Sequence, residues 1–378
     1  MKSEKQKTEG KSLIPSWLLF LLFVIFLTTL GLVILISAGS AKEDSLVFFK
    51  KQATWLVIAT VIGTAAAFIN LNLLRKYALH FGVFSVLTLI AVAIPHIGKV
   101  VNGARRWIEV GPITFQPSDI GKIALVVLLA WYLQNNQRYM KTFLKGFLYP
   151  MTIAGFFFLL IIIEPDFGTA TLCAIVSLSM IFLAGTKFLY IIAIFILGVA
   201  GILTLVYFDP VRWARLTSYL DLENNKLDGA YQLYQAILGF GAGGVDGAGL
   251  GQGRQQQFFL PEAHTDFIFA IVGEELGLVF TLLVVAAFFA MFLIVVSRLK
   301  KAPNIFELYI AAGSMLMITL QSIFNMGVVT GMFPTKGISL PFLSYGGSNL
   351  VAMSVFAGLL VNCLRSWNKP IKIKATLL

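Results

Sequence analysis

The sequence predicts an all-α polytopic membrane protein with ten transmembrane helices and a large extracytoplasmic loop between the seventh and eighth helices. Composition is the first reason: of 378 residues, 58% are hydrophobic and 12% are charged, whereas a soluble domain is roughly 45–50% apolar and about 25% charged. The second is the recurrence of uncharged runs of about 20 residues, the length that crosses a bilayer as a helix. The mean hydropathy of +0.85 agrees with both, and a water-soluble globule is excluded.

The ten predicted spans follow one another closely, except for one long polar insert. We expect them at about residues 17–38, 52–74, 77–97, 113–133, 146–163, 167–185, 188–208, 266–297, 306–332 and 345–364. The predicted membrane domain therefore covers residues 17–364, with the extracytoplasmic loop at 209–264 and cytoplasmic tails at 1–16 and 365–378.

Two spans have unusual lengths. The first, from Trp17 to Ser37, is too long for the core of a signal peptide and is interpreted as a retained span. The eighth runs for 31 residues from Asp266 to Val296, which is roughly 46 Å of helix against a hydrocarbon core of about 30 Å. We expect this helix to tilt, bend or project outward.

The basic residues predict the orientation. Ten spans place both termini on one side, and the segments on that side hold 17 of the 29 Lys and Arg residues. By the positive-inside tendency, both termini are cytoplasmic and the protein lies in the cytoplasmic (inner) membrane. Topology accounts for the net charge of +11, so no nucleic-acid partner is expected. The acidic residues, 15 of 18, fall on or near the outer side, which we expect to be the working face.

The segment 261–269, PEAHTDFIF, runs from charged residues straight into an apolar helix. Asp266 is expected at the outer membrane boundary, where partial desolvation raises a carboxyl pKa toward that of a useful general base. The alternative is that Thr265 or Asp266 simply caps the helix. His264, beside them, is a candidate substrate-binding residue or an ordinary interfacial polar group.

The fourth span contains an acidic and a basic residue. A helix of about 20 residues ending near Gln134 must include Asp119 and Lys122, whose i,i+3 spacing puts them on one face. Ionisable residues inside a membrane face a protein interior or a water-filled cavity, so they predict a functional site. The alternative is a structural ion pair.

Arginine and tryptophan are paired twice outside the spans. Arg105 and Arg106 precede Trp107, and Arg215 follows Trp213 in the insert. Arginine forks suit diphosphate oxygens, and tryptophan suits a sugar face or the headgroup layer. The same residues are common as plain anchors at membrane surfaces.

Two glycine-rich stretches could bring the backbone close to a ligand in a groove open to lipid. One lies at residues 239–253 of the insert, after Gln235; the other runs from Pro334 and Lys336 to Ser344 and Ser348. Neither has the setting of a nucleotide-binding loop. The turn with Glu164 and Asp166, and the i,i+4 pair Gln321 and Asn325, have alternatives as a solvated turn and as helix-to-helix contacts.

These motifs together resemble the SEDS (shape, elongation, division and sporulation) family of FtsW- and RodA-like proteins. The resemblance rests on the PEAHTDFIF and GEELG (273–277) segments, PTKG (334–337) with SYGGS (344–348), RRW (105–107), QPS (116–118) and EPDFGT (164–169), in the family's order over about residues 17–364. The PTKG and EAHTD forms are closer to the division branch. Asp119 stands where Glu is expected, and Ala236 and Ala242 where Ser is expected.

The resemblance implies a peptidoglycan glycosyltransferase that polymerises lipid II at the outer face of the cytoplasmic membrane. It also implies a lipid-linked glycan strand as product, a class B penicillin-binding protein as transpeptidase partner, and contacts with other divisome proteins. By position, Asp266 matches the family's catalytic aspartate, and Asp119 with Lys122 a functionally important pair. Substrate-binding candidates are Arg105, Arg106, Trp107, Asp119, Lys122, Arg215, Gln235, His264, Lys336 and Ser344.

In the expected mechanism, Asp266 deprotonates the acceptor sugar hydroxyl, a step worth about 10²–10⁴-fold in rate. Cationic side chains, with a divalent cation such as Mg²⁺ or Mn²⁺, stabilise the departing diphosphate. Two other functions fit the same pattern. A lipid II flippase also needs a polar cavity with access from the lipid, and a scaffold would only recruit a partner.

Overall fold

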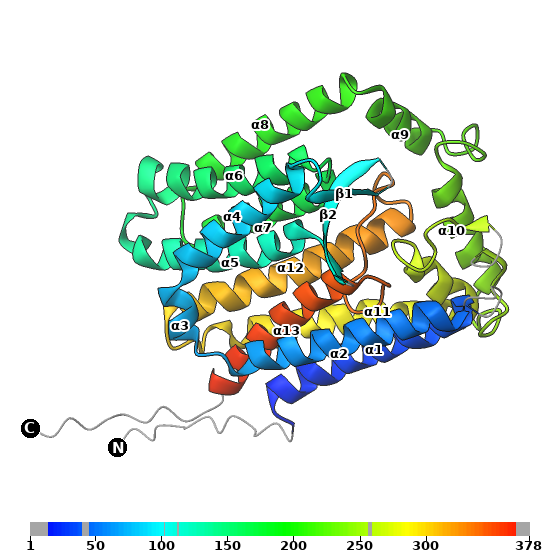
Figure 1. Ribbon diagram of the computed structural model, residues 1–378, viewed down its shortest axis with the longest axis horizontal. Coiled ribbons are helices and arrows are strands. Elements are labelled where there is room, and N and C mark those ends of the chain that lie inside the picture. Colours follow the sequence, from blue (N-terminus) through cyan, green and yellow to red (C-terminus); the bar gives the residue numbers. More distant parts are fainter. Residues whose placement is uncertain (1–13, 40–44, 102, 112, 256–258, 368–378) are drawn as a thin grey trace, which may run out of the picture.

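The computed structural model describes residues 14–39, 45–101, 103–111, 113–255 and 259–367 (Figure 1). These residues are mostly helical, and each predicted span overlaps at least one helix. The helices are α1 (Ser16–Gly39), α2 (Ser45–Phe68), α3 (Leu71–Lys76), α4 (Ala78–Ala93), α5 (Pro117–Asn135), α6 (Tyr149–Ile163), α7 (Phe167–Leu183), α8 (Phe188–Tyr207), α9 (Pro210–Leu220), α10 (Tyr231–Gly243), α11 (Ile268–Leu299), α12 (Ile305–Val329) and α13 (Gly347–Trp367), with short 3₁₀ and π turns at Gln137–Tyr139 and Leu144–Leu148.

The apolar helices confirm a protein with several membrane-spanning segments. Within the described ranges, six are long and apolar enough to cross a bilayer, and α4, α7 and α8 are shorter apolar helices. α5 is not in that set because Asp119 and Lys122 make it less apolar. It nevertheless lies inside the bundle, surrounded by α4, α6, α7, α12 and α13. Its side chains from Ala124 to Ala130 are all buried.

The most extensive helix pairing joins α2 to α13. Gly358 lies directly against the main-chain oxygen of Gly63, where a Cβ would overlap it. Small residues of this kind let two membrane helices approach closely. By contrast, α8 packs mainly against its neighbours α7 and α9, has no buried residue along its described length, and runs along the edge of the bundle (Figure 1).

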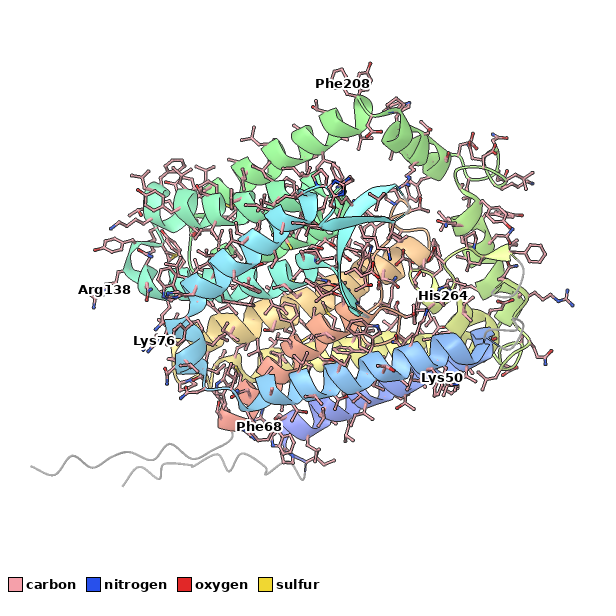
Figure 2. The ribbon with its side chains drawn as sticks, viewed as in Figure 1. Lys50, Phe68, Lys76, Arg138, Phe208 and His264 are labelled. Carbon is pink, nitrogen blue, oxygen red and sulfur yellow. The ribbon has the colours of Figure 1, made fainter. Side chains whose placement is uncertain are left out.

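Residues that we expect on opposite sides of the membrane lie at opposite ends of the bundle (Figure 2). Figure 2 shows Lys76 and Arg138 near one end and His264 and Lys50 near the other. The first two belong to segments that we expect on the cytoplasmic side, and the last two to segments expected outside. Most of the predicted tails, 1–16 and 365–378, lies outside the described residues.

The all-α prediction is wrong between α4 and α5, where the chain forms a small antiparallel sheet. Its strands are β1 (Gly98–Val101), β2 (Ala104–Val110) and β3 (Ile113–Phe115), in the order β1-β2-β3. Lys99 pairs with Trp107, and Glu109 with Thr114. The valines and isoleucines of this stretch favour strands, and the Asn102-Gly103 dipeptide is a hairpin signal. The fourth span therefore begins at Pro117 rather than at residue 113.

The predicted loop 209–264 holds two helices, α9 and α10, followed by the glycine-rich residues 243–253. These glycines pack on α11, which bends at Gly277 (φ 75°, ψ −171°). The main-chain N–H groups of Ala248 and Gly249 donate to the carbonyls of Glu274 and Glu275 at 2.9 and 3.0 Å. The bend confirms that the long eighth span is not one straight rod.

Candidate active site

One cavity of about 740 Å³ opens at the end of the bundle where Asp266 lies. Its walls come from α2, from the sheet and the start of α5, from the start of α7, from the turn before α11, and from the segment between α12 and α13. The ionisable side chains in the lining are Lys51, Arg106, Asp119, Lys122, Asp166, Glu262, His264 and Asp266. Six of the eleven predicted site residues line this cavity: Arg106, Trp107, Asp119, Lys122, His264 and Asp266.

Asp266 lies in the turn that precedes α11, with a half-buried side chain. Its carboxylate faces Gly337, and a Cβ built on that glycine would stand 2.6 Å from Oδ2. Burial raises the pKa of Asp266 to about 7, and the negative charges of Glu262 and Asp166 add to the rise. The capping alternative is wrong, because the residue at the cap position is Phe267, with no side-chain hydrogen bond to the helix.

His264 links this turn to the opposite wall. Its main-chain carbonyl accepts a hydrogen bond from the N–H of Tyr345 at 2.9 Å, and the two rings lie 5.6 Å apart between centroids, tilted by 57°. The imidazole therefore lines the cavity beside an aromatic ring, a surface that suits the face of a sugar.

Asp119 and Lys122 form a buried ion pair, with Nζ 2.7 Å from Oδ1. Lys122 also donates to the side-chain oxygens of Gln321 and Asn349, at 3.3 and 3.2 Å. Gln321 in turn donates to the carbonyl of Ser339. The pair thus joins α5, α12 and α13 under the cavity floor. The functional and the structural interpretations of this pair are therefore compatible.

Arg106 reaches from β2 to the turn between α6 and α7. Its guanidinium donates to the carbonyl of Glu164 at 2.8 Å and to that of Pro165. Asp166 caps α7 by accepting from the N–H of Thr169 at 3.1 Å, and it accepts from the amide of Gln116 at 3.1 Å. Both acids of this turn are buried, so the interpretation as a solvated turn is wrong.

Glu164 is a buried acid without a partner for either carboxyl oxygen among the described residues. Burial raises its pKa to about 9; the charges of Asp166 and Asp119 act in the same direction, while Arg106 opposes them. At neutral pH this side chain is therefore uncharged, and Arg106 keeps its charge available to the cavity.

Five predicted substrate-binding residues, Arg105, Arg215, Gln235, Lys336 and Ser344, do not line the cavity. The Arg105 guanidinium instead donates to the carbonyl of Ala93, at the end of α4. Arg215 and Gln235 belong to α9 and α10. The Lys336 ammonium lies 4.8 Å from the centroid of the Phe167 ring, and the buried Ser344 hydroxyl accepts from the N–H of Leu340 at 2.7 Å.

Sequence reasoning missed the contribution of α2. Lys51 and Trp55, spaced i,i+4 on one helix face, both line the cavity. The indole of Trp55 lies directly against Gly347, where a Cβ would overlap it. The amide of Gln52 donates to the carbonyl of Ser344 at 3.4 Å. Nothing in the neighbouring sequence distinguishes this Lys and Trp from residues at a membrane surface. They reach the cavity only because α2 packs against α13.

The cavity combines a carboxylate whose pKa lies near neutrality with two cationic side chains, Arg106 and Lys51, and with aromatic and amide groups. A site of this kind can accept a proton from a hydroxyl and hold an anionic, sugar-bearing ligand. Within the described residues, no group of three or more His, Cys, Asp and Glu side chains is arranged to hold a metal ion. The apolar helices and this polar end cavity define a polytopic membrane protein with a candidate site at the mouth of its helical bundle.

The chain belongs to the FtsW, RodA and SpoVE family of cell cycle proteins, whose profile matches residues 17–369. This confirms the resemblance to the SEDS family. The probable peptidoglycan glycosyltransferase FtsW of Geobacter sp. (strain M18) is 36% identical over 354 residues, covering 91% of this chain and 95% of that protein.

Two solved structures share the fold. A chain of a peptidoglycan synthase complex that coordinates polymerization and crosslinking superposes with a TM-score of 0.78 at 24% identity, covering 95% of this chain and 100% of that one. The rod shape determining protein RodA of Thermus thermophilus superposes with a TM-score of 0.69 at 23% identity, covering 95% and 99%. These likenesses confirm the helical membrane fold.

Proposed function

We propose that this protein is a peptidoglycan glycosyltransferase that polymerises lipid II into glycan strands at the outer face of the cytoplasmic membrane during cell division. The observation that carries the proposal is the place of Asp266: its carboxylate lines a cavity of about 740 Å³ that also contains Arg106 and Lys51. The relatives named as FtsW glycosyltransferases support the same activity and favour it over a flippase.

Asp266 acts as the general base. The 4-hydroxyl of the acceptor sugar attacks the anomeric carbon of the donor, the carbon–oxygen bond to undecaprenyl diphosphate breaks, and the hydroxyl proton passes to the carboxylate. A base with a pKa of about 7 is matched to this task near neutral pH, because it is ionised in a large share of molecules and still binds a proton well. A single displacement inverts the configuration at the anomeric carbon.

Arg106 and Lys51 bind the diphosphate. The leaving group already carries negative charge, so cations that stabilise it assist the reaction more than an acid would. The structure changes the predicted set of cations, because Arg105, Arg215 and Lys336 do not line the cavity whereas Lys51 does. Asp119 and Lys122 keep the cavity floor ordered through their links to Gln321 and Asn349.

A divalent cation, Mg²⁺ or Mn²⁺, would have to arrive with the substrate. The described side chains do not fit a metal held by the protein alone, whereas Mg²⁺ is commonly bound by one or two carboxylates together with substrate phosphates. When bound there, the ion would neutralise diphosphate charge. We assign no step of the reaction to it.

The proposed topology has ten crossings, both termini in the cytoplasm, and the segment between α8 and α11 outside. The support is the positive-inside tendency, together with the placement of Lys76 and Arg138 at one end of the bundle and of His264 and Lys50 at the other (Figure 2). The cavity mouth then faces outward, where Asp266, Glu262 and Asp166 lie together. This arrangement gives a lipid-linked substrate access from the outer leaflet.

The proposed partner is a class B penicillin-binding protein that crosslinks the new strand, with other divisome proteins around it. Support comes from the structural neighbour that belongs to a complex coordinating polymerization and crosslinking. The partner's contact surface on this chain is not assigned.

The test is reconstitution of the protein with its transpeptidase partner and labelled lipid II. We expect ladders of glycan strand from the native chain and none from Asp266→Asn, which keeps the side-chain shape but cannot accept the proton. A folded Asp266→Asn protein that polymerises at the native rate would exclude the base. Labelled lipid crossing a vesicle bilayer without ladders would indicate a flippase, and retained partner binding without ladders a scaffold.

A further inference from the structure

Asn325 joins the two chain segments that surround the Asp266 carboxylate. Its side chain, 1% exposed near the C-terminal end of α12, donates one hydrogen bond to the main-chain carbonyl of Asp266 and a second to that of Ile338, both at 2.7 Å. One segment carries the base itself. The other carries Gly337, the residue directly opposite the carboxylate.

The orientation of this amide is fixed by its surroundings. A reversed amide would place its oxygen against two carbonyl oxygens, so the nitrogen must face them and both of its hydrogens are used. The amide oxygen, in return, is buried and accepts no hydrogen bond from the described residues. An unpaired buried acceptor is costly. The structure therefore keeps the two hydrogen bonds donated by the Asn325 nitrogen even though its oxygen stays unpaired.

The neighbouring amide on α12 shows what is particular to Asn325. Gln321, one turn earlier, donates to the carbonyl of Ser339 at 2.8 Å and to the side chain of Asn349 at 2.9 Å. It therefore holds the 337–339 segment but not the turn that carries Asp266. Asn325 holds both, and thereby sets the distance between them.

We propose that Asn325 is a positioning residue for the reaction: it holds the Asp266 turn and the Gly337 segment together, so that the carboxylate stays aimed into the cavity and shielded from water. The inference rests on the proposed function. Removing the clamp lets the two segments separate, admits water to the carboxylate and misplaces it relative to the sugar hydroxyl. A small misplacement of a catalytic group costs about 10²-fold in rate.

The inference predicts a change in the titration of Asp266, so the charges around it matter. Carboxylates that face the same cavity are Glu262, on the same turn, Asp166 of α7 and Asp119 of α5. Cations are Lys122 of α5, Arg106 of β2 and Lys51 of α2, and His264 can also titrate. Asn325→Ala changes none of these groups, so a shift in the titration reports the surroundings of Asp266.

The matched control is Asn362 of α13, whose amide also donates two hydrogen bonds to main-chain carbonyls, far from the site. Its amide donates to the carbonyls of Ala66 and Ile69 at 3.2 and 2.8 Å, near the end of α2. Asn362→Ala therefore removes two similar hydrogen bonds from another buried amide. A purely structural role for Asn325 predicts that both variants lose stability and neither changes the chemistry.

The experiment measures polymerisation of labelled lipid II by the full chain with its partner, across a range of pH, for the native protein, Asn325→Ala and Asn362→Ala. For Asn325→Ala we expect a turnover number lower by about 10- to 100-fold, a smaller change in KM, and a rising limb of the pH profile whose midpoint moves from about 7 to lower pH. Asn362→Ala should retain the native midpoint and turnover number.

A second measurement is independent of turnover. Lipid-soluble carbodiimides modify protonated carboxyl groups, and mass spectrometry follows the modification of Asp266 against pH in the intact protein. The midpoint should fall in Asn325→Ala and not in Asn362→Ala. Asn325→Ser, which keeps a polar side chain too short to bridge both carbonyls, should shift in the same direction if Asn325→Ala does not fold.

The outcomes separate the two proposals. Native midpoints and turnover in folded Asn325→Ala or Asn325→Ser would overturn the positioning role while leaving Asp266 as the base. Equal losses in the Asn325 and Asn362 variants without a shift in midpoint would also overturn it. If the native protein forms no glycan strand, the proposed function fails, and the carbodiimide midpoints still decide whether Asn325 sets the surroundings of Asp266.

Discussion

The two glycine-rich segments, 243–253 and 333–349, look alike in the sequence but do different work in the fold. The second lines the cavity: Gly337 faces the Asp266 carboxylate, and Gly346 and Gly347 lie at its wall. The first makes no part of the cavity wall. It wraps the bend of α11, where the amide of Gly251 donates to the Glu275 carboxylate at 3.2 Å and the amide of Arg254 to that of Glu274 at 2.7 Å.

The difference shows that a high glycine content predicts close backbone approach but does not predict what is approached. In 333–349 the backbone approaches the Asp266 carboxylate and the cavity. In 243–253 it approaches another helix, and the carboxylates of Glu274 and Glu275 serve as acceptors for loop N–H groups. Substitutions in 333–349 should therefore change activity, and those in 243–253 should change stability.

The largest effect is expected at Gly337. In Gly337→Ala the new Cβ would stand 2.6 Å from Oδ2 of Asp266, which forces the carboxylate out of place. Polymerisation by folded protein should fall about 10²–10³-fold, with little change in the unfolding temperature. In the control Gly346→Ala, the nearest atoms lie 3.9 Å from the new Cβ, so the loss should be much smaller. Equal losses would remove the distinction between the two positions.

The second prediction concerns the segment that wraps the bend. Gly247 has a φ of +83°, and a Cβ there would overlap the main-chain oxygen of Glu275. Gly247→Ala should lower the free energy of unfolding by about 2–3 kcal/mol, because strain and overlap add. Thermal unfolding in detergent measures the loss. Gly241→Ala, inside α10 with open space around its Cβ, should be neutral or slightly stabilising; a native-like Gly247→Ala would contradict the structural role.

The third prediction tests the cavity wall contributed by α2. Lys51→Ala removes a cation that faces the ligand, and the KM for lipid II should rise about 10-fold, as expected for the loss of one charge-assisted contact. Lys50, the adjacent lysine, is exposed and does not line the cavity. Lys50→Ala should leave KM near the native value. Matching changes in the two variants would indicate a general surface charge effect.

The smallest effect at any one pH step is expected from Glu164, whose pKa is raised to about 9 by burial. The folded protein holds this proton between the ordinary glutamate pKa and about 9, whereas the unfolded chain has released it, so stability falls as pH rises through that window. The slope is at most about 1.4 kcal/mol per pH unit. Glu164→Gln, which mimics the protonated acid, should remove that slope in thermal unfolding; an unchanged slope would place its source elsewhere.

Much of the fold could be predicted because the bilayer imposes a length and a composition on each crossing. The predicted spans overlap helices, and the length of the eighth span already indicated a bend or a projection. The sheet was missed because its strands are short and lie between two spans in a stretch that reads as a loop. Hydropathy predicts which segments lie in the lipid, but it predicts little about strands in the loops outside the membrane.

The sequence predicted those cavity residues that can be recognised from their own chain segment. Asp266, His264, Asp119, Lys122, Arg106 and Trp107 were found because each stands in an unusual local setting, such as charge beside an apolar helix. The predicted residues that do not line the cavity are ones whose place depends on tertiary structure. The Arg105 side chain is bound to the end of α4, and Arg215 follows α9 away from the cavity, whereas Lys51 is brought in by the packing of α2 on α13. The spacing of residues along one chain segment does not predict such contacts between segments that are distant in the sequence.

The bend at Gly277 has a mechanical consequence. Below it, Leu278–Leu299 forms a rod of about 22 residues and about 33 Å, close to the thickness of the hydrocarbon layer, about 30 Å. Above it, a short helix leads to Asp266 and is tied to the 243–253 segment by its own hydrogen bonds. A thicker or thinner bilayer changes the tilt of the rod. With the bend at Gly277 in between, we expect the change in tilt to stop at the bend, so that the side chains around Asp266 keep their spacing in membranes of different lipid composition.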